Sequence, residues 1–226
     1  MFCRCFLMAT LVAVCWDRPA AAVSKTEPTG STRFSPSGCH PEPDSSFVLV
    51  TFDKTYMGNY RPGEPYDYVT IAADGQGETF AESGISITLF LRTSDGRNCV
   101  GIPAQEIQLY SPDLCICPGG SIADRPTDLN GMTSFSGTIA GGGCTEMLSI
   151  YFNGVRIGTT GVKINSTDTG LASPCATDAG DFSALAARLG RPEQWSICFD
   201  YNESGPPTID AGDLSYFAAV LGAGCR

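Results

Sequence analysis

Histidine is almost absent from this 226-residue chain: the single one, His40, stands between Cys39 and Pro41 in a proline-rich segment. A serine or cysteine nucleophile needs a neighbouring base, usually histidine, so the sequence offers no hydrolytic triad. A glycoside hydrolase needs only two suitably spaced carboxylates, but no substrate cleft is visible in the pattern. We therefore expect a protein that is not an enzyme, with glycoside hydrolysis as the least favoured alternative.

Basic residues are scarce as well. The chain has 14 Lys and Arg against 24 Asp and Glu, which gives a net charge of -10. Nucleic acids are bound through basic patches, so we expect no nucleic-acid partner. The abundant carboxylates are instead suited to calcium, a hard cation that takes oxygen ligands.

Long apolar runs are missing beyond the N-terminus. There, Arg4 precedes an apolar run from Cys5 to Trp16, and Pro19-Ala20-Ala21-Ala22 follows it. This order predicts a secretory signal peptide over residues 1–22. A lipoprotein signal before Cys15 is a weaker alternative, because a bulky valine precedes that cysteine. The run is shorter than the roughly 20 residues of a membrane helix, so we expect no membrane span and a secreted or cell-surface protein.

Cysteine is frequent by contrast. Three of the 11 cysteines lie in the predicted signal, and eight remain. An even number in an exported chain favours disulfides. Zinc is the alternative at Cys115-Ile116-Cys117, but these two thiols are closer in sequence than zinc ligands usually are. The eight are Cys39, Cys99, Cys115, Cys117, Cys144, Cys175, Cys198 and Cys225.

The middle of the chain has the apolar period of two that is typical of strands. Residues 23–45 are rich in Ser, Thr, Pro and Gly and predict a flexible lead-in. Between the expected strands lie turns such as Gly141-Gly142-Gly143, and Asn153-Gly154 predicts a two-residue hairpin. Short strands at this spacing favour an antiparallel sandwich of two sheets over residues 46–164. The expected strands are 47–52, 68–71, 85–91, 106–110, 132–139, 147–152, 155–158 and a last one ending near 164.

One segment of this region carries a family resemblance. Thr127-Asp128-Leu129-Asn130-Gly131-Met132-Thr133-Ser134-Phe135 resembles the turn that leads into a strand in bacterial Ig-like domains. The resemblance implies an Ig-like β-sandwich, although turn chemistry alone can produce such a segment.

The C-terminal region, residues 165–226, is a duplication. Residues 178–190 align with residues 210–222 at an offset of 32 (210 − 178). In each copy apolar residues recur at i, i+3, i+4 and i+7, which predicts two short helices with one apolar stripe each. The stripes are Phe182, Leu185, Ala186 and Leu189, and Leu214, Phe217, Ala218 and Leu221. We expect the two stripes to face one another, within a mostly β protein with a small α tail.

An oxygen-rich loop precedes each helix. Asp168 lies 13 residues before Asp181, and Asp200 lies 13 residues before Asp213. A loop with oxygens at alternate positions and a carboxylate at the start of a helix can surround calcium. The candidate ligands are Asp200, Asn202, Ser204, Asp210 and Asp213 in the second loop, and Asp168, Asp178 and Asp181 in the first.

The second loop resembles a type I dockerin repeat, in which Gly205 would permit the sharp turn. The resemblance implies Asp213 as the bidentate calcium ligand and a cohesin-like or other surface protein as the partner of the helices. Pro206-Pro207-Thr208 make this loop two residues longer than the usual twelve or so. The first loop departs further, because Gly170 and Ala172 replace Asn202 and Ser204.

Simple helix capping is the alternative to calcium. Asp178 and Asp210 would then cap the helices, and Asp181 and Asp213 would complement the positive helix ends. Cys198 and Cys225 flank the second repeat, which predicts a disulfide between them.

The expected function is therefore a secreted or cell-surface scaffold or attachment protein with a calcium-binding, dockerin-like tail. The short connection from Ile164 to Asp168 favours a rigid unit. A carbohydrate-binding module, using the cluster Tyr56, Tyr60, Tyr66 and Tyr68 on polysaccharide, is the alternative.

Overall fold

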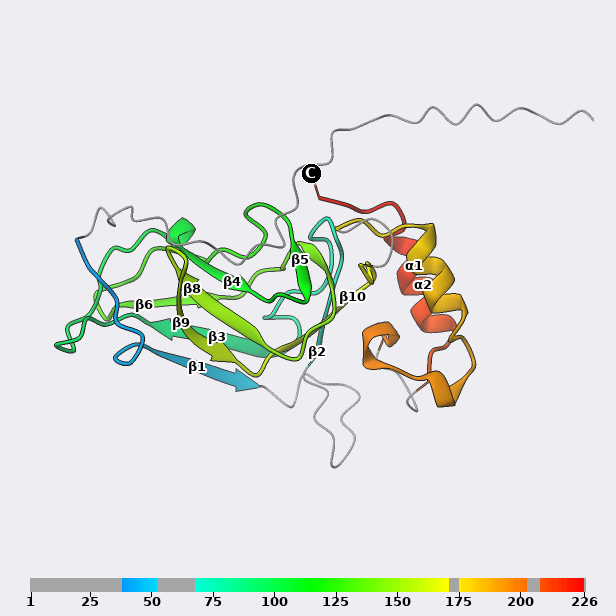
Figure 1. The fold of residues 1–226 in the computed structure, drawn as a ribbon, viewed down its shortest axis with the longest axis horizontal. Helices are drawn as coiled ribbons and strands as arrows, with labels where there is room; N and C mark the ends of the chain where they lie inside the picture. The colour runs from blue at the N-terminus through cyan, green and yellow to red at the C-terminus, as the bar shows by residue number, and fades with distance from the viewer. Residues whose placement is uncertain (1–37, 53–67, 171–174, 203–207, 226) are drawn as a thin grey trace, which may run out of the picture.

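The computed structural model describes residues 38–52, 68–170, 175–202 and 208–225. In these ranges the chain is mostly β with a small α tail, as the periodicities predict (Figure 1). The strands are β1 Phe47–Phe52, β2 Tyr68–Ile71, β3 Ile85–Phe90, β4 Ile107–Tyr110, β5 Leu114–Ile116, β6 Met132–Phe135, β7 Gly141–Gly143, β8 Leu148–Phe152, β9 Val155–Thr160 and β10 Lys163–Ser166. The helices are α1 Ala179–Ala186 and α2 Ala211–Ala219, with 3-10 turns η1 Ala104–Glu106, η2 Pro192–Gln194 and η3 Ile197–Phe199.

Two three-stranded antiparallel sheets, β1-β3-β6 and β4-β8-β9, enclose the apolar core. The alternation in β3 places Ile85, Ile87 and Leu89 in that core, each at most 2% exposed. From the other sheet, Leu109 and Ile150 face the same core and are equally buried. The sandwich is thus held by apolar burial between the two sheets.

Two of the predicted turns are confirmed. Asn153 and Gly154 have φ of 45° and 79°, which are the positive angles needed for a tight turn from β8 to β9. In the segment that resembles Ig-like domains, the Asp128 carboxylate accepts the N–H groups of Asn130 and Met132, and β6 begins at Met132.

Two details of the sheet prediction are wrong. The pair β2 and β10 is parallel, so the sheets are not antiparallel throughout. The segment Gly141–Gly143, predicted as a turn, is strand β7 and pairs with β5. Its glycines are required because a Cβ on Gly141 would collide with the carbonyl of Cys115.

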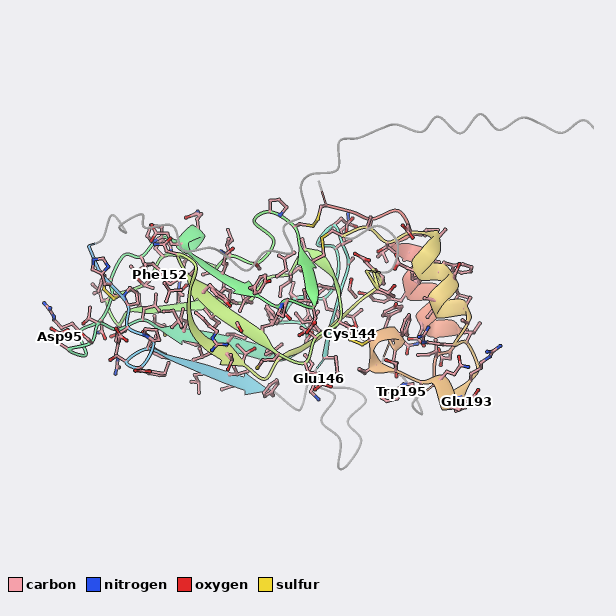
Figure 2. All side chains as sticks on the ribbon, in the orientation of Figure 1. Asp95, Cys144, Glu146, Phe152, Glu193 and Trp195 are labelled. Atoms are coloured by element: carbon pink, nitrogen blue, oxygen red, sulfur yellow. A yellow bond between two sulfur atoms is a disulfide. The ribbon has the colours of Figure 1, made fainter. Side chains whose placement is uncertain are left out.

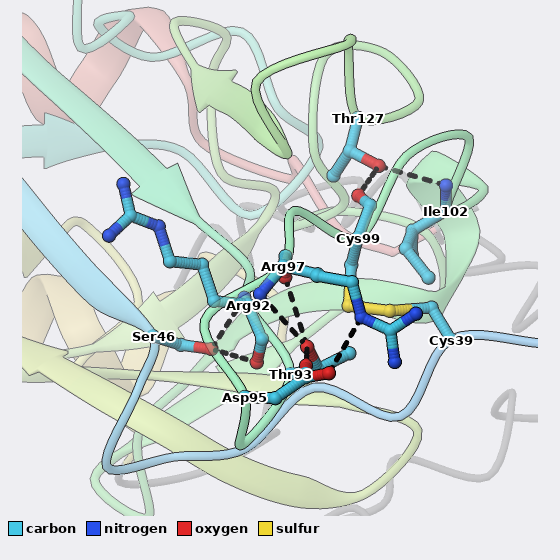
Figure 3. The surroundings of a disulfide bond; sticks show 9 residues. All are labelled: Cys39, Ser46, Arg92, Thr93, Asp95, Arg97, Cys99, Ile102 and Thr127. Atoms are coloured by element: carbon cyan, nitrogen blue, oxygen red, sulfur yellow. Dashed lines mark hydrogen bonds and ion pairs between the residues drawn. A yellow bond between two sulfur atoms is a disulfide. The ribbon is translucent and has the colours of Figure 1, made fainter.

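Packing begins earlier than expected. The predicted signal peptide lies outside the described residues, but Cys39, within the predicted lead-in, forms a disulfide with Cys99 (Figure 3). The N–H of Glu42 donates to the carbonyl of Arg92 at 2.7 Å, and the Ser46 hydroxyl bonds to both the N–H and the carbonyl of Arg92. Residues 39–46 are therefore fixed against the sandwich.

The tail lies beyond the β2 and β10 end of the sandwich, with α1 and α2 side by side (Figure 1). Strand β10 continues past the predicted domain boundary, and its Asn165 side chain donates to the carbonyls of Ile197 and Asp200 at 2.8 and 2.9 Å. From β2, the Thr70 hydroxyl donates to the Tyr201 carbonyl at 3.2 Å. These bonds join the two regions into one packed body.

Three disulfides cross the same boundary: Cys115–Cys175, Cys117–Cys225 and Cys144–Cys198. Disulfides are thus confirmed over zinc, and the predicted Cys198–Cys225 pairing is wrong. Cys175 and Cys225 instead lie next to each other, since the N–H of Cys225 donates to the Cys175 carbonyl at 3.0 Å, and they bond to Cys115 and Cys117 respectively. In Figure 2, Cys144 lies at the boundary, Trp195 lies beyond it in the tail and Glu193 lies farther out.

Candidate functional site

Each tail helix begins with a capping box, because an aspartate stands at both the N-cap and the third helical position. In α1, the N–H of Gly180 donates to Asp178 Oδ1 at 2.6 Å, and the N–H of Asp178 donates to Asp181 Oδ2 at 2.8 Å. In α2, Gly212, Asp210 and Asp213 repeat this arrangement at 2.6 and 2.8 Å.

The other oxygen of each closing aspartate holds the start of its loop. Asp181 Oδ1 accepts both the N–H and the hydroxyl of Thr169, at 2.8 and 2.6 Å. Asp213 Oδ1 accepts the N–H groups of Tyr201 and Asn202, at 2.6 and 3.1 Å. We call these two arrangements the aspartate clamps: Asp181 with Thr169 and Asp178, and Asp213 with Tyr201, Asn202 and Asp210. The closing aspartates of both clamps, Asp181 and Asp213, are fully buried from solvent.

The first residue of each loop is also engaged within the protein. Asp168 accepts the N–H groups of Gly170 and Ala176 at 2.7 and 3.1 Å. Asp200 Oδ2 accepts the indole N–H of Trp195 at 2.9 Å. Burial raises the pKa of Asp168 to about 6, and the nearby negative charge of Asp181 acts in the same direction. Burial likewise raises the pKa of Asp213.

The remaining predicted ligands do not complete a common centre among the described residues. The Asn202 side chain donates an N–H to Asp210 Oδ1 at 3.3 Å, so its amide group faces that carboxylate. Ser204 lies outside the described residues. Within the described ranges, the acidic and thiol side chains that converge in a set of three are Cys117, Cys175 and Cys225, all of them disulfide-bonded. Among the described residues, the carboxylates do not converge on the common centre that a calcium site needs.

Tyr201 is a site residue that sequence reasoning missed. Its side chain is 2% exposed and packs with Leu185, Ile209 and Phe217 between the two repeats. Burial raises its pKa far above the ordinary value for tyrosine. A tyrosine one position after Asp200 carries no motif, and only its main-chain N–H enters the clamp, so no side-chain pattern could have identified it.

The predicted apolar stripes face one another only in part. Leu185 and Phe217 are fully buried, and the Phe182 and Phe217 rings lie 5.9 Å apart. Phe182, Leu189 and Leu221 remain 43%, 40% and 57% exposed. Leu189 and Leu221 occupy equivalent positions of the duplication, just past the ends of α1 and α2, and we call the exposed side chains of Phe182, Leu189 and Leu221 the exposed apolar surface.

The tyrosine platform expected for sugar binding is not observed among the described residues. Tyr68 is only 8% exposed, and the Lys163 ammonium lies 5.2 Å from its ring centroid. Tyr56, Tyr60 and Tyr66 lie outside the described residues. Within the part of the chain that the structure describes, no observation favours the carbohydrate-binding alternative.

Comparisons with known proteins identify no family for this chain. No family model and no curated protein matches the chain. Among solved structures, the chain is similar to the Yersinia pseudotuberculosis adhesin InvE at 20% identity, over 61% of this chain and 29% of that chain, with a TM-score of 0.28. A score this low supports no conclusion on fold or function, so the Ig-like and dockerin resemblances stay predictions from the sequence.

Two further observations concern location. Four disulfides are typical of proteins that leave the cytosol. The described helices are all too short or too polar to cross a membrane.

Proposed function

We propose that this chain is an exported, non-catalytic attachment or scaffold protein whose helix pair docks another protein. The exposed apolar surface at Phe182, Leu189 and Leu221 is the observation that carries the proposal. Leu189 and Leu221 lie just past the ends of α1 and α2, at equivalent positions of the duplication, and both are exposed, whereas single exposed apolar side chains are ordinary on any surface.

Because the second repeat resembles a dockerin, we propose a protein of cohesin-like type as the partner, and not a second copy of this chain. An amphipathic helix pair presents such anchors to an apolar face of its partner. The three disulfides that cross the boundary hold the helices against the sandwich. A docked helix pair would therefore carry the whole sandwich with it, as attachment requires.

Titration of the immobilised chain with purified type I cohesin domains tests the proposal. Replacing both leucines with aspartate (L189D/L221D) removes the apolar anchors, and we expect at least a tenfold loss of affinity, since central anchors cost over 1 kcal/mol when removed. The matched control is Leu129→Asp, because Leu129 is 82% exposed on a turn bonded to Asn98 of the sandwich, away from the helices.

Equal affinities of the unchanged chain and L189D/L221D, or no binding of any cohesin domain, would contradict the proposal. The alternative partner is a second copy of the same chain, which sedimentation of the chain alone tests. A dimer that dissociates in the L189D/L221D variant would assign the exposed apolar surface to self-association.

A further inference from the structure

We infer that the two loops of the tail close on the protein's own N–H and hydroxyl donors instead of on calcium, so that the helix pair folds without a cation. This holds whichever partner the helix pair docks.

Asp181 and Asp213, the aspartates that close the two loops, have few hydrogen-bond acceptor sites left for a cation. A carboxylate offers about four lone-pair sites. Asp213 receives three donors, from Tyr201, Asn202 and Asp210. Asp181 also receives three, two from Thr169 and one from Asp178. Bidentate ligation of calcium needs both oxygens of such a residue, and both are already engaged.

The aspartate clamp occurs in both repeats of the tail. The main-chain donors Thr169 and Tyr201 are 32 residues apart, as are Asp181 and Asp213 (201 − 169 = 213 − 181). Two of the three bonds are the same in both repeats although the loops differ in sequence, and the third donor is the Thr169 hydroxyl in the first clamp and the Asn202 N–H in the second. The clamp is therefore a property of the repeat itself, and it satisfies buried carboxylates that would otherwise be costly.

Disulfides also restrain the two loops, as a bound cation would. Cys175 lies inside the first loop and bonds to Cys115 of β5, while Cys198 lies just before the second loop and bonds to Cys144. A disulfide thus ties the first loop, and the segment that leads into the second loop, to the sandwich. Cross-links of this kind restrict the unfolded chain, which reduces the ordering that a cation would need to supply.

The test is thermal unfolding of the full chain in millimolar calcium and in excess EDTA. We expect the two midpoints to agree within about 1 °C, whereas a cation at about 100 times its Kd would raise the midpoint by roughly 5 °C or more. Calorimetric titration with calcium should show no saturable heat. A saturable heat, or a calcium-dependent rise in the midpoint, would overturn the inference.

Two variants keep the test informative. Thr169→Ala removes one hydroxyl donor from the first clamp, and we expect it to lower the midpoint by the same amount in calcium and in EDTA. Asp213→Asn removes an acceptor of the second clamp and should do the same. A loss that calcium restores in either variant would show that the cation orders the loops. Because no partner is present, these results are independent of the cohesin titration.

Discussion

The main-chain N–H of Tyr201 donates to the Asp213 carboxylate across 2.6 Å, in the buried interior of the tail. This bond connects the beginning of the second loop to the first turn of α2, and the Asp210 N–H bonds to the other oxygen at 2.8 Å. One side chain therefore fixes the entry of the loop, its exit and the start of the helix.

Replacing Asp213 with asparagine should destabilise the protein by about 1–3 kcal/mol, because one acceptor becomes a donor that faces a main-chain N–H. Asp210→Asn is the matched control, since asparagine caps helices as well as aspartate does, and its effect should stay within about 0.5 kcal/mol. Guanidinium unfolding curves measure both. Equal effects of the two substitutions would contradict the clamp.

A second prediction concerns the contact between β7 and the first loop. A Cβ on Gly142 would collide with the Asp168 carboxylate, whereas a Cβ on Gly137 meets nothing within 4 Å. Gly142→Ala should therefore cost about 1–3 kcal/mol in free energy of unfolding, and Gly137→Ala should be close to neutral. If thermal unfolding gives both variants the same midpoint, the close approach of Gly142 to Asp168 is not present in solution.

The raised pKa of Asp168 predicts a pH dependence of stability. The pKa of Asp168 is about 6 in the folded state, against an ordinary value of 3.8. The folded protein therefore binds the proton of Asp168 more tightly than the unfolded chain does. The free energy of unfolding should therefore fall as pH rises from about 4 to about 6, by roughly 3 kcal/mol.

Asp168→Asn should flatten this slope, because asparagine does not titrate. Glu78 and Asp213 also have raised pKa values, so a smaller fall should persist in the variant. Denaturant unfolding across this pH range measures the difference, and identical slopes would exclude Asp168 as the source.

The two faces of the helix pair should respond differently to truncation. Phe217→Ala empties a buried site and should cost about 3–5 kcal/mol. Leu221, just past the C-terminal end of α2, is 57% exposed, so Leu221→Ala should change stability by less than about 0.5 kcal/mol. Denaturation midpoints test this, and a large loss for Leu221→Ala would show that the apolar surface is covered within the chain.

The sequence predicted the features that depend on local periodicity and turn chemistry. Alternation of apolar residues located β3, and Asn153-Gly154 located the turn between β8 and β9. In each copy of the duplication, the recurrence of apolar residues at i, i+3, i+4 and i+7 located α1 and α2. All of these are encoded within about ten neighbouring residues.

The features that were missed depend on residues distant in sequence. The pairing Cys144–Cys198 spans 54 positions, and spacing alone favoured a bridge inside the second repeat. The pairing of β7 with β5 requires glycine for close approach, although three glycines also predict a turn. In the site, the spacing of Asp200 and Asp213 is the same for a metal loop and for a clamp. Only the orientation of the N–H groups distinguishes them.

Hydrogen exchange of the α1 and α2 amides tests the central claim most directly, since it reports the order of each repeat separately. The clamps predict the same protection factors in millimolar calcium and in excess EDTA. Protection that rises in calcium at Asp181 and Asp213 and in the turns that follow them would contradict the account.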